Sequence, residues 1–443
     1  MATNGNQRRP DAAAERETFS SGWGMIFALL GVSIGLGNFW RFPYMMGIFG
    51  GGAFLAIYLL IVVVVGVPAL LAELMLGRAT GRGPVEAFVR AGVPAGRQIG
   101  QLLFVGVAMA MTYYLVVLGW LLAYLVMSLG WALGLNEISS ASFAALHARW
   151  PVQMLCSAIV AGAAATVVTR GVRSGIERIS SVFLPVFGVL TLGLVAWSLS
   201  LPGAGEGFRY LFTFDWRALT PLAVMAAVGQ AYFSLGLGGT FLVIYGSYLP
   251  ADAPLPRRAI STAVGDVAAS ILAALIVIPV AFAYGLSPAT GPPLLFEVMP
   301  AAFVAMPAGP VFGVAFFLGL LCIAFLSGVA AIEVLVGSLA DSRGWSRGRS
   351  AWVISTLLVL AGLPAMLSLD YIVWSDLLWG STMQPVGSVA AVVALAWGLG
   401  RSSVRQQLTR SGSCPWWVSA WFFWVRYVVP AAVLVALLSG WLG

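Results

Sequence analysis

Ser33-Ile-Gly-Leu-Gly-Asn-Phe39 and Ser234-Leu-Gly-Leu-Gly-Gly-Thr-Phe241 each place glycines two residues apart in the middle of a long apolar segment. Each glycine weakens a helix interior by about 1 kcal/mol relative to alanine. An unwound turn also exposes backbone N–H and C=O groups that lipid cannot satisfy, so such a break persists only where it lines a cavity. The alternative is close helix packing through small residues, which explains one such stretch more easily than both.

The composition around these stretches is that of a membrane protein. The 443 residues are 60% hydrophobic and only 9% charged, whereas a soluble globular chain carries about 25% charged residues. Uncharged runs reach the roughly 20 apolar residues that a helix needs to cross a bilayer, and the strands of an outer-membrane barrel would alternate in character instead. We therefore expect an all-α integral membrane protein.

The polar interruptions predict about eleven transmembrane helices. They lie near residues 20–44, 50–77, 98–130, 151–169, 179–200, 218–248, 259–286, 309–340, 350–367, 376–399 and 420–440. The glycine stretches fall in spans one and six, which are corresponding places in two halves of five helices. Broken helices in such places indicate a five-plus-five inverted repeat with a transporter's binding site near the midplane.

This organisation predicts one transporter domain after a short tail. The expected divisions are a cytoplasmic tail at 1–18 and a transporter domain at 19–443, with repeat one at about 19–200, repeat two at about 216–399 and an extra helix at about 420–440.

All 23 basic residues are arginine, and they gather in alternate loops between the spans. If the amino terminus is cytoplasmic, the outside loops hold only Arg149, Arg209 and the boundary residue Arg217. This asymmetry predicts a multi-pass protein of the cell's inner (plasma) membrane, with a cytoplasmic amino terminus and an outside carboxyl terminus.

Several function classes are disfavoured by what the chain lacks. Without lysine there is no Schiff-base or P-loop lysine chemistry. One histidine and the scattered Cys156, Cys322 and Cys414 do not suit a metal centre or a disulfide framework, and no nucleophile–base pair indicates an enzyme. Arginines that lie between apolar spans do not indicate nucleic-acid binding. The expected partners are the lipid bilayer and a small molecule, with no obligatory protein partner implied.

Longer motifs carry a resemblance to a known family. The runs Gly35-Leu-Gly-Asn-Phe-Trp-Arg-Phe-Pro43, Gly50-Gly-Gly-Ala-Phe54, Arg170-Gly-Val-Arg-Ser-Gly-Ile-Glu-Arg178 and Gly229-Gln-Ala-Tyr-Phe-Ser-Leu-Gly236 occur in the right order across the chain. In these motifs the chain resembles the neurotransmitter:sodium symporter family, in its bacterial amino-acid transporter branch. The resemblance implies sodium-driven uptake of an amino acid by alternating access.

The substrate site that the resemblance implies lies between the unwound parts of spans one and six. Its expected residues are Ser33, Leu36, Gly37, Ala110, Tyr114, Phe233, Ser234, Gly236, Gly239, Ser327 and Ala331. Members that carry monoamines place an Asp where this chain has Gly35, which favours an amino acid as substrate. Ala110, Gly236, Gly239 and Ala331 are small where the family's leucine carrier has bulkier residues, which favours a large hydrophobic or aromatic side chain.

Two sodium sites are implied in the same way. The first consists of Ser33, Asn38, Ser234 and Asp266, and the second of Gly31, Ile34, Ile323 and Ser327. At the second site Leu326 replaces an oxygen-bearing family residue, so one or two sodium ions remain possible. Asp266 replaces the family's Asn beside Tyr58, Gln230, Ser234 and Ser270, which match the chloride site of animal members, and chloride is therefore not expected to be required.

The expected gates use charged residues at each side of the membrane. Arg16 is expected to meet Asp341 at the inner gate, with Tyr248 beside it, and Arg41 is expected to act at the outer gate. The acid that would pair with Arg41 falls near Gly380 or Ser381, with only Asp376 close by. The weakened second sodium site and Asp266 leave a proton-coupled or exchanging amino-acid transporter of the same fold as the alternative.

Overall fold

The computed structural model describes residues 17–135, 141–289, 295–408 and 416–442, and every regular element in these ranges is helical. Nine helices in this part of the chain are long and apolar enough to cross a membrane, and a tenth span is a helix pair bent by 52°. Side chains such as Leu60, Val63 and Val189 expose more than half of their surface on the outside of the bundle, as lipid contact requires. The predicted fold class is confirmed.

The expected spans correspond to the following elements. They are α1 (Gly22–Ser33), η1 (Gly37–Arg41) and α2 (Phe42–Ile48); α3 (Gly52–Ile61), η2 (Val62–Gly66) and α4 (Val67–Thr80); α6 (Gly96–Ala132); α8 (Trp150–Thr169); η3 (Val172–Glu177) and α9 (Arg178–Ser200); α11 (Pro221–Ser234) and α12 (Phe241–Gly246); α13 (Leu255–Ala283); α15 (Gly309–Arg343); α16 (Arg347–Ala361) and α17 (Leu363–Leu367); α18 (Leu369–Ser375), η6 (Asp376–Thr382), α19 (Met383–Val393), η7 (Ala394–Leu399) and α20 (Gly400–Leu408); and α21 (Trp417–Phe423), η8 (Trp424–Val428) and α22 (Val429–Leu442).

The connecting segments contain shorter helices. These are α5 (Pro84–Arg90), α7 (Ala141–His147), α10 (Ala204–Phe212), η4 (Trp216–Ala218) and α14 (Val298–Val304). No single long helix forms the sixth expected span, because residues 235–240 separate α11 from α12. The first span is interrupted at 34–36. Both glycine stretches therefore break their helices, as the sequence predicts.

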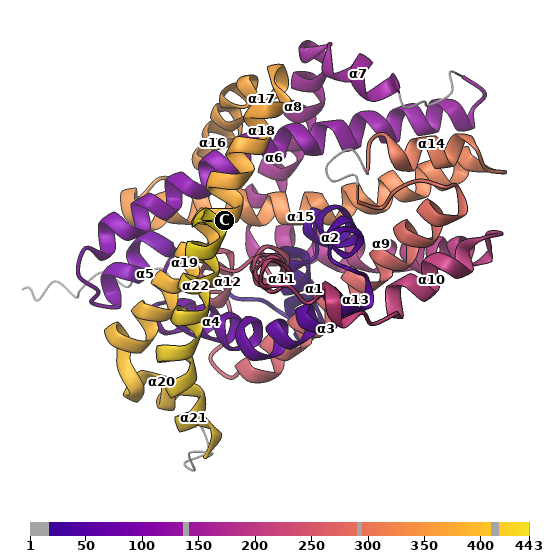
Figure 1. The fold of residues 1–443 in the computed structure, drawn as a ribbon. Helices are drawn as coiled ribbons and strands as arrows, with labels where there is room; N and C mark the ends of the chain where they lie inside the picture. The colour runs from indigo at the N-terminus through magenta and orange to yellow at the C-terminus, as the bar shows by residue number, and fades with distance from the viewer. Residues whose placement is uncertain (1–16, 136–140, 290–294, 409–415, 443) are drawn as a thin grey trace, which may run out of the picture.

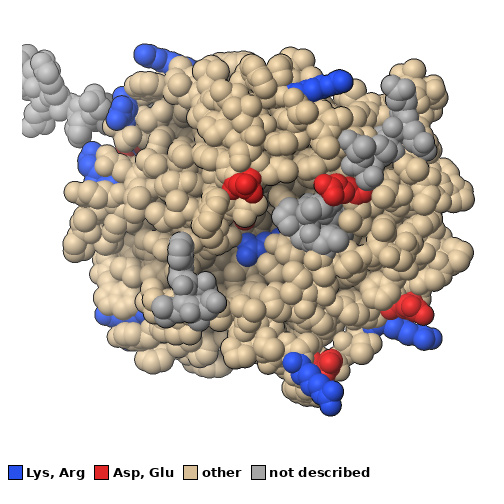
Figure 2. Space-filling model, turned by 45° about the horizontal axis from the view of Figure 1, so that its top comes forward, with Lys and Arg blue, Asp and Glu red and all other residues tan. Residues whose placement is uncertain are grey.

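The broken helices lie in the middle of the bundle. Figure 1 shows α1 and α11 at its centre, with α20, α21 and α22 along one side. The long helix α15 packs against α6, α8, α9 and α16, and α12 packs against α4. On the face shown in Figure 2, charged side chains are few and lie singly or in small groups among uncharged residues. This arrangement covers both breaks with other helices.

Local sequence sets where the two broken helices begin. The Ser21 hydroxyl accepts a hydrogen bond from Gly24 N at 2.9 Å and caps α1, and the Thr220 hydroxyl caps α11 in the same way, followed by Pro221 at the first helical position. Side-chain oxygens and an initial proline satisfy the geometry of a helix start. The Glu177 carboxylate also accepts bonds from Ser21, at 3.0 Å from N and 2.8 Å from Oγ.

Gly238 shows why the second break needs glycine. Its φ of +78° lies in the left-handed region, which glycine adopts without a steric penalty. A Cβ atom at this position would lie 1.5 Å from the carbonyl oxygen of Gln384. The backbone of the break therefore packs directly on α19, and a larger residue would separate the two.

A buried ion pair joins α15 to the start of α16. The fully buried Glu333 carboxylate receives Arg347 Nη2 at 2.7 Å and Nη1 at 3.0 Å, and it also accepts a hydrogen bond from the Tyr248 hydroxyl of the turn after α12. The bidentate geometry is the strong form of this pair. Three separate segments are thus held at one point.

Breaking this pair should destabilise the protein. Arg347→Met leaves the Glu333 charge buried without its partner, which costs about 3–5 kcal/mol, so the melting temperature of the purified protein in detergent should fall. Glu333→Gln combined with Arg347→Met removes both charges and should recover most of that loss. Arg257→Met, at an exposed arginine, is the control. Equal loss in the single and double variants would contradict the buried-charge explanation.

Candidate functional site

The two helix breaks face and satisfy each other. Gln230 Nε2 donates to the Gly37 carbonyl oxygen at 3.0 Å, and the Ser33 hydroxyl lies 3.3 Å from the carbonyl oxygen of Leu235. These bonds join residues about 200 positions apart in the chain. The Leu235 carbonyl is one that an unbroken helix would have bonded internally, whereas the Gly37 carbonyl also accepts the backbone N–H of Phe42.

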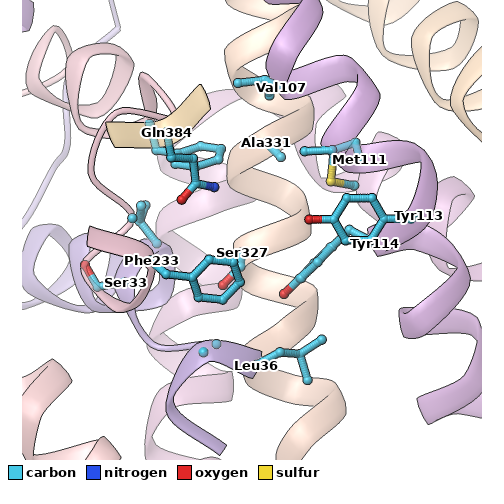
Figure 3. Close-up of a pocket in the computed structure, with 16 residues that line it drawn as sticks. Ser33, Leu36, Val107, Met111, Tyr113, Tyr114, Phe233, Ser327, Ala331 and Gln384 are labelled. Carbon is cyan, nitrogen blue, oxygen red and sulfur yellow. The ribbon is translucent and has the colours of Figure 1, made fainter. Parts of the chain in front are cut away.

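A cavity of about 80 Å³ lies between the breaks, α6 and α15. Figure 3 shows Phe233, Tyr114 and Gln384 arranged around it, with Ser327 on the helix behind. Its lining residues are Val32, Ser33, Gly35, Leu36, Gly37, Val107, Ala110, Met111, Tyr113, Tyr114, Phe233, Gly236, Phe241, Ser327, Ala331 and Gln384. An apolar cavity with a few convergent polar groups is the usual form of a small-molecule site.

Most of the residues expected at the substrate site line this cavity. They are Ser33, Leu36, Gly37, Ala110, Tyr114, Phe233, Gly236, Ser327 and Ala331. Ser234 does not line it, because its hydroxyl points to the Asp266 carboxylate at 2.9 Å. Gly239 lines a separate cavity of about 20 Å³ that shares Ala110 and Phe241 with the first.

Sequence reasoning missed two lining residues that affect the shape of the cavity. Gln384, on α19, has a buried side-chain oxygen without a hydrogen-bond partner among the described residues, and its signal was an amide in an apolar span. Phe241 gave no such signal. A Cβ atom on Gly239 would lie 2.0 Å from the Phe241 ring, so this ring fills space that the small residues were expected to leave open.

A fully buried oxygen cluster lies beside the cavity. Asn38 Nδ2 is 2.8 Å from Asp266 Oδ1, 3.0 Å from Ser234 Oγ and 2.9 Å from Ser270 Oγ. The Tyr58 hydroxyl lies 3.2 Å from Asp266 Oδ2. The cluster unites three of the residues expected at the first sodium site, Asn38, Ser234 and Asp266, with Tyr58 and Ser270, which match the chloride site of animal members.

The charge of this cluster suits a cation. Asp266 is fully buried, and its side-chain partners among the described residues, Asn38, Ser234 and Tyr58, are all neutral. A carboxylate removed from water without an opposite charge is costly. The carboxylate and hydroxyl oxygens and the one negative charge fit a small cation such as sodium. Asn38 turns its Nδ2 toward these oxygens, while its Oδ1 accepts a hydrogen bond from Gly35 N at 2.8 Å. Ser33, the fourth expected ligand, ends α1 and lines the cavity.

The residues expected at the second sodium site also converge. The Ser327 hydroxyl oxygen lies 3.3 Å from the Gly31 carbonyl oxygen, 3.2 Å from that of Ile34 and 3.4 Å from that of Ile323. A Cβ atom on Gly31 would lie 3.1 Å from Leu326 Cδ1. Hydrocarbon therefore packs against the first helix where an oxygen ligand would be needed.

The expected outer gate is only partly assembled. Arg41 lies 5.1 Å from the centre of the Phe233 ring, and its Nη1 is 3.4 Å from Ser381 Oγ. Asp376 instead accepts a hydrogen bond from the Tyr113 hydroxyl at 2.8 Å. Within the described ranges no ion pair joins Arg41 to an acid. The contact of Arg41 with Phe233 nevertheless places a cation over an aromatic ring that lines the cavity.

The structure describes only one of the two charged residues that are expected at the inner gate. Arg16 lies outside the described residues. Asp341 lies 3.5 Å from Arg82 Nη1 and accepts a hydrogen bond from Gly83 N, just before α5. Tyr248 donates to Glu333. The Asp341 carboxylate thus holds the segment that leads into α5.

Glu73 supports the second break directly. Its Oε1 accepts a hydrogen bond from Gly238 N at 2.8 Å, and the carboxylate is fully buried on α4. Because Gly238 also packs against Gln384 on α19, the unwound segment is held from two sides. This contact brings a fully buried acid to the backbone of the second break.

Comparison with known proteins identifies a family to which this chain is similar. A family model described as the sodium:neurotransmitter symporter family matches residues 16–145 and 131–441. An uncharacterized sodium-dependent transporter, YhdH of Bacillus subtilis, is 34% identical over 94% of this chain and 96% of its own length. The sodium-dependent serotonin transporter of Drosophila melanogaster is 29% identical over 79% of this chain and 64% of its own length.

A solved structure has the same fold over nearly the whole chain. The crystal structure of MhsT in complex with L-phenylalanine matches with a TM-score of 0.86 and 33% identity, and it covers 96% of this chain and 99% of its own. The family model spans nearly the whole chain, and the Bacillus subtilis relative and MhsT are each more than 30% identical to it. The chain belongs to the sodium:neurotransmitter symporter family.

Proposed function

We propose that this protein carries a large hydrophobic or aromatic amino acid across the membrane together with sodium, by alternating access around the central cavity. The observation that carries the proposal is the cavity between two helix breaks with an anionic oxygen cluster beside it. The phenylalanine bound to MhsT supports an amino-acid substrate. The proposed orientation has the amino terminus in the cytoplasm and the carboxyl terminus outside, as the arginine distribution predicts.

Each end of the zwitterion has a suitable partner in the proposal. The backbone N–H groups of Leu36 and Gly37, at the start of the second half-helix, would bind the carboxylate because helix N-termini attract anions. The Tyr114 hydroxyl, which donates to the Ala324 carbonyl oxygen at 3.2 Å, would turn to join them. Carbonyl groups at the ends of the half-helices would hold the ammonium group.

Gly35 supports a substrate that brings its own carboxylate. A Cβ atom at this position would lie 2.8 Å from Ser327 Oγ and 3.7 Å from the Tyr114 hydroxyl. An acidic side chain here would need those neighbours to move. The wall of the cavity therefore supplies no carboxylate at the position that monoamine carriers use.

A proton-coupled or exchanging transporter of the same fold is the second candidate. It is favoured by Asp266, a buried acid with neutral partners, and by Leu326 at the second sodium site. In such a transporter a proton on Asp266 would replace the ion. Uptake of radiolabelled amino acids into proteoliposomes, with a sodium gradient and with a proton gradient alone, separates the two.

Large substrates should compete better than small ones. Each buried methylene group contributes about 0.8 kcal/mol, so Trp, Tyr, Phe or Leu should inhibit uptake at lower concentration than Ala or Gly. Filling the cavity also requires the Phe241 ring to turn, and Phe241→Ala should increase the preference for the largest substrates. Stronger competition by Gly or Ala than by Trp would refute the size assignment.

Transport should not require chloride. The Asp266 carboxylate supplies the negative charge that an anion would supply beside a neutral Asn, so uptake should be equal in chloride and gluconate buffers. Asp266→Asn removes this charge and should abolish uptake or make it depend on chloride. Strict chloride dependence of the unmodified protein would be incompatible with this role of Asp266.

The number of sodium ions that drive each transport cycle should be closer to one than to two. At the second site three carbonyl oxygens and the Ser327 hydroxyl converge, and a desolvated cation with too few ligands is costly. Leu326→Thr adds an oxygen, and with about 1.5 kcal/mol for a charge-assisted contact the apparent sodium affinity should rise roughly tenfold. Valine has the shape of threonine but no oxygen, so Leu326→Val is the matched control. A Hill coefficient near two in the unmodified protein would overturn this assignment.

A further inference from the structure

A second and larger cavity lies at the end of the bundle where α6 begins and α15 ends. Its volume is about 230 Å³, and its lining residues are Val85, Arg97, Gln101, Phe104, Ser338, Leu339, Ser342 and Arg343. None of these residues lines the central cavity or belongs to the oxygen cluster. The cavity therefore needs an explanation of its own.

Helix periodicity brings the polar residues of this cavity together. On α6, Arg97, Gln101 and Phe104 are spaced four and then three residues apart, so they share one face. On α15, Ser338 and Ser342 share a face for the same reason. Both faces become more polar toward the end of the bundle, from Phe104 to Arg97 on one helix and from Ser338 to Arg343 on the other.

The donors in this cavity are largely unused. The nearest acid to Arg97 is Glu86, at 3.8 Å between Nη2 and Oε1, which is longer than a hydrogen bond. Arg343 and Gln101 make no hydrogen bond or ion pair within the part of the chain that the structure describes. The hydroxyls of Ser338 and Ser342 donate to the Val334 and Ser338 carbonyl oxygens at 2.7 and 2.6 Å. Arg97, Gln101 and Arg343 are exposed to solvent, so the N–H groups of Arg343 and Gln101 and those of Arg97 that do not face Glu86 are available to a ligand.

The chemistry of these donors points to a phosphate. A guanidinium group presents paired N–H donors that match the oxygens of a phosphate. The arginines alone have a simpler explanation, because arginine is enriched in cytoplasmic loops of membrane proteins. That enrichment does not explain a cavity of this size, nor the two arginines and an amide that converge on it.

The apolar part of the cavity indicates where the phosphate comes from. Phe104 and Leu339 also line it and are partly buried against the core, whereas its arginines are exposed. The neighbouring Leu102 and Val105 of α6 are 48% and 47% exposed. This order, with charge at the mouth and hydrocarbon beyond it, matches the order of head group and acyl chain in a phospholipid. Basic pockets between transmembrane helices bind anionic head groups in this way. We propose that the cavity binds the phosphate of an anionic phospholipid head group.

The test uses the purified full chain in detergent and native mass spectrometry, titrated separately with phosphatidylglycerol and phosphatidylcholine. One phosphatidylglycerol should be retained roughly tenfold more tightly than phosphatidylcholine. Arg97→Gln combined with Arg343→Gln should lose this preference. Arg178→Gln combined with Arg257→Gln removes the same charge from two exposed arginines outside the cavity and should keep it.

A further variant and a competition arm complete the test. Ser342→Glu keeps both arginines but places a carboxylate in the cavity, and it should weaken phosphatidylglycerol retention while the protein still elutes as a single species. If millimolar inorganic phosphate displaces the lipid, the cavity recognises the phosphate group, and a soluble phosphate can occupy it as well. Equal retention of both lipids, or equal loss in the cavity and control double variants, would overturn the proposal. Neither result depends on sodium or amino-acid transport.

Discussion

The unsatisfied backbone of two broken helices is the constraint on which the rest of this structure depends. Lipid offers no partner for a free N–H or C=O group, so each break must find its partners inside the protein. The Ser33 hydroxyl donates to the Leu235 carbonyl oxygen, and Glu73 accepts a hydrogen bond from the N–H of Gly238. Ser33 also lines the central cavity, so this side chain both satisfies a break and helps to enclose the cavity.

Two buried acids show how surroundings determine what a carboxylate can do. Glu333 is neutralised by the bidentate Arg347, and its role is to join α15, α16 and the turn after α12. Asp266 is buried as completely but has only neutral partners among the described side chains. A buried charge without a counter-ion is unfavourable, so a cation that binds there stabilises the folded state. One acid strengthens the scaffold, and the other leaves a place for an ion.

The space available to a substrate depends on a ring that the small residues do not reveal. Ala110, Gly236 and Ala331 line the cavity, which agrees with the expectation from their positions. The Phe241 ring, however, lies against Gly239 and divides the central cavity from its smaller neighbour. Small residues at these positions therefore suggest a larger cavity than the one that is open in this conformation. The reason is that a neighbouring side chain packs into the space that they leave.

Sequence alone determined the membrane class, the approximate positions of the spans, the two helix breaks and most of the cavity lining. These features follow from composition, from hydrophobic length and from the cost of glycine in a helix, which are local properties, together with motifs that match a family. Tertiary structure alone decided that Glu73 supports Gly238, that Phe241 fills space beside Gly239, that Gln384 joins the cavity, and that Asp376 bonds Tyr113 while Arg41 lies over Phe233. All of these except the contact of Phe241 with Gly239 join residues far apart in the chain, and the distance between them is set by the packing of whole helices. The Phe241 contact depends on how the chain turns between the two halves of the sixth span.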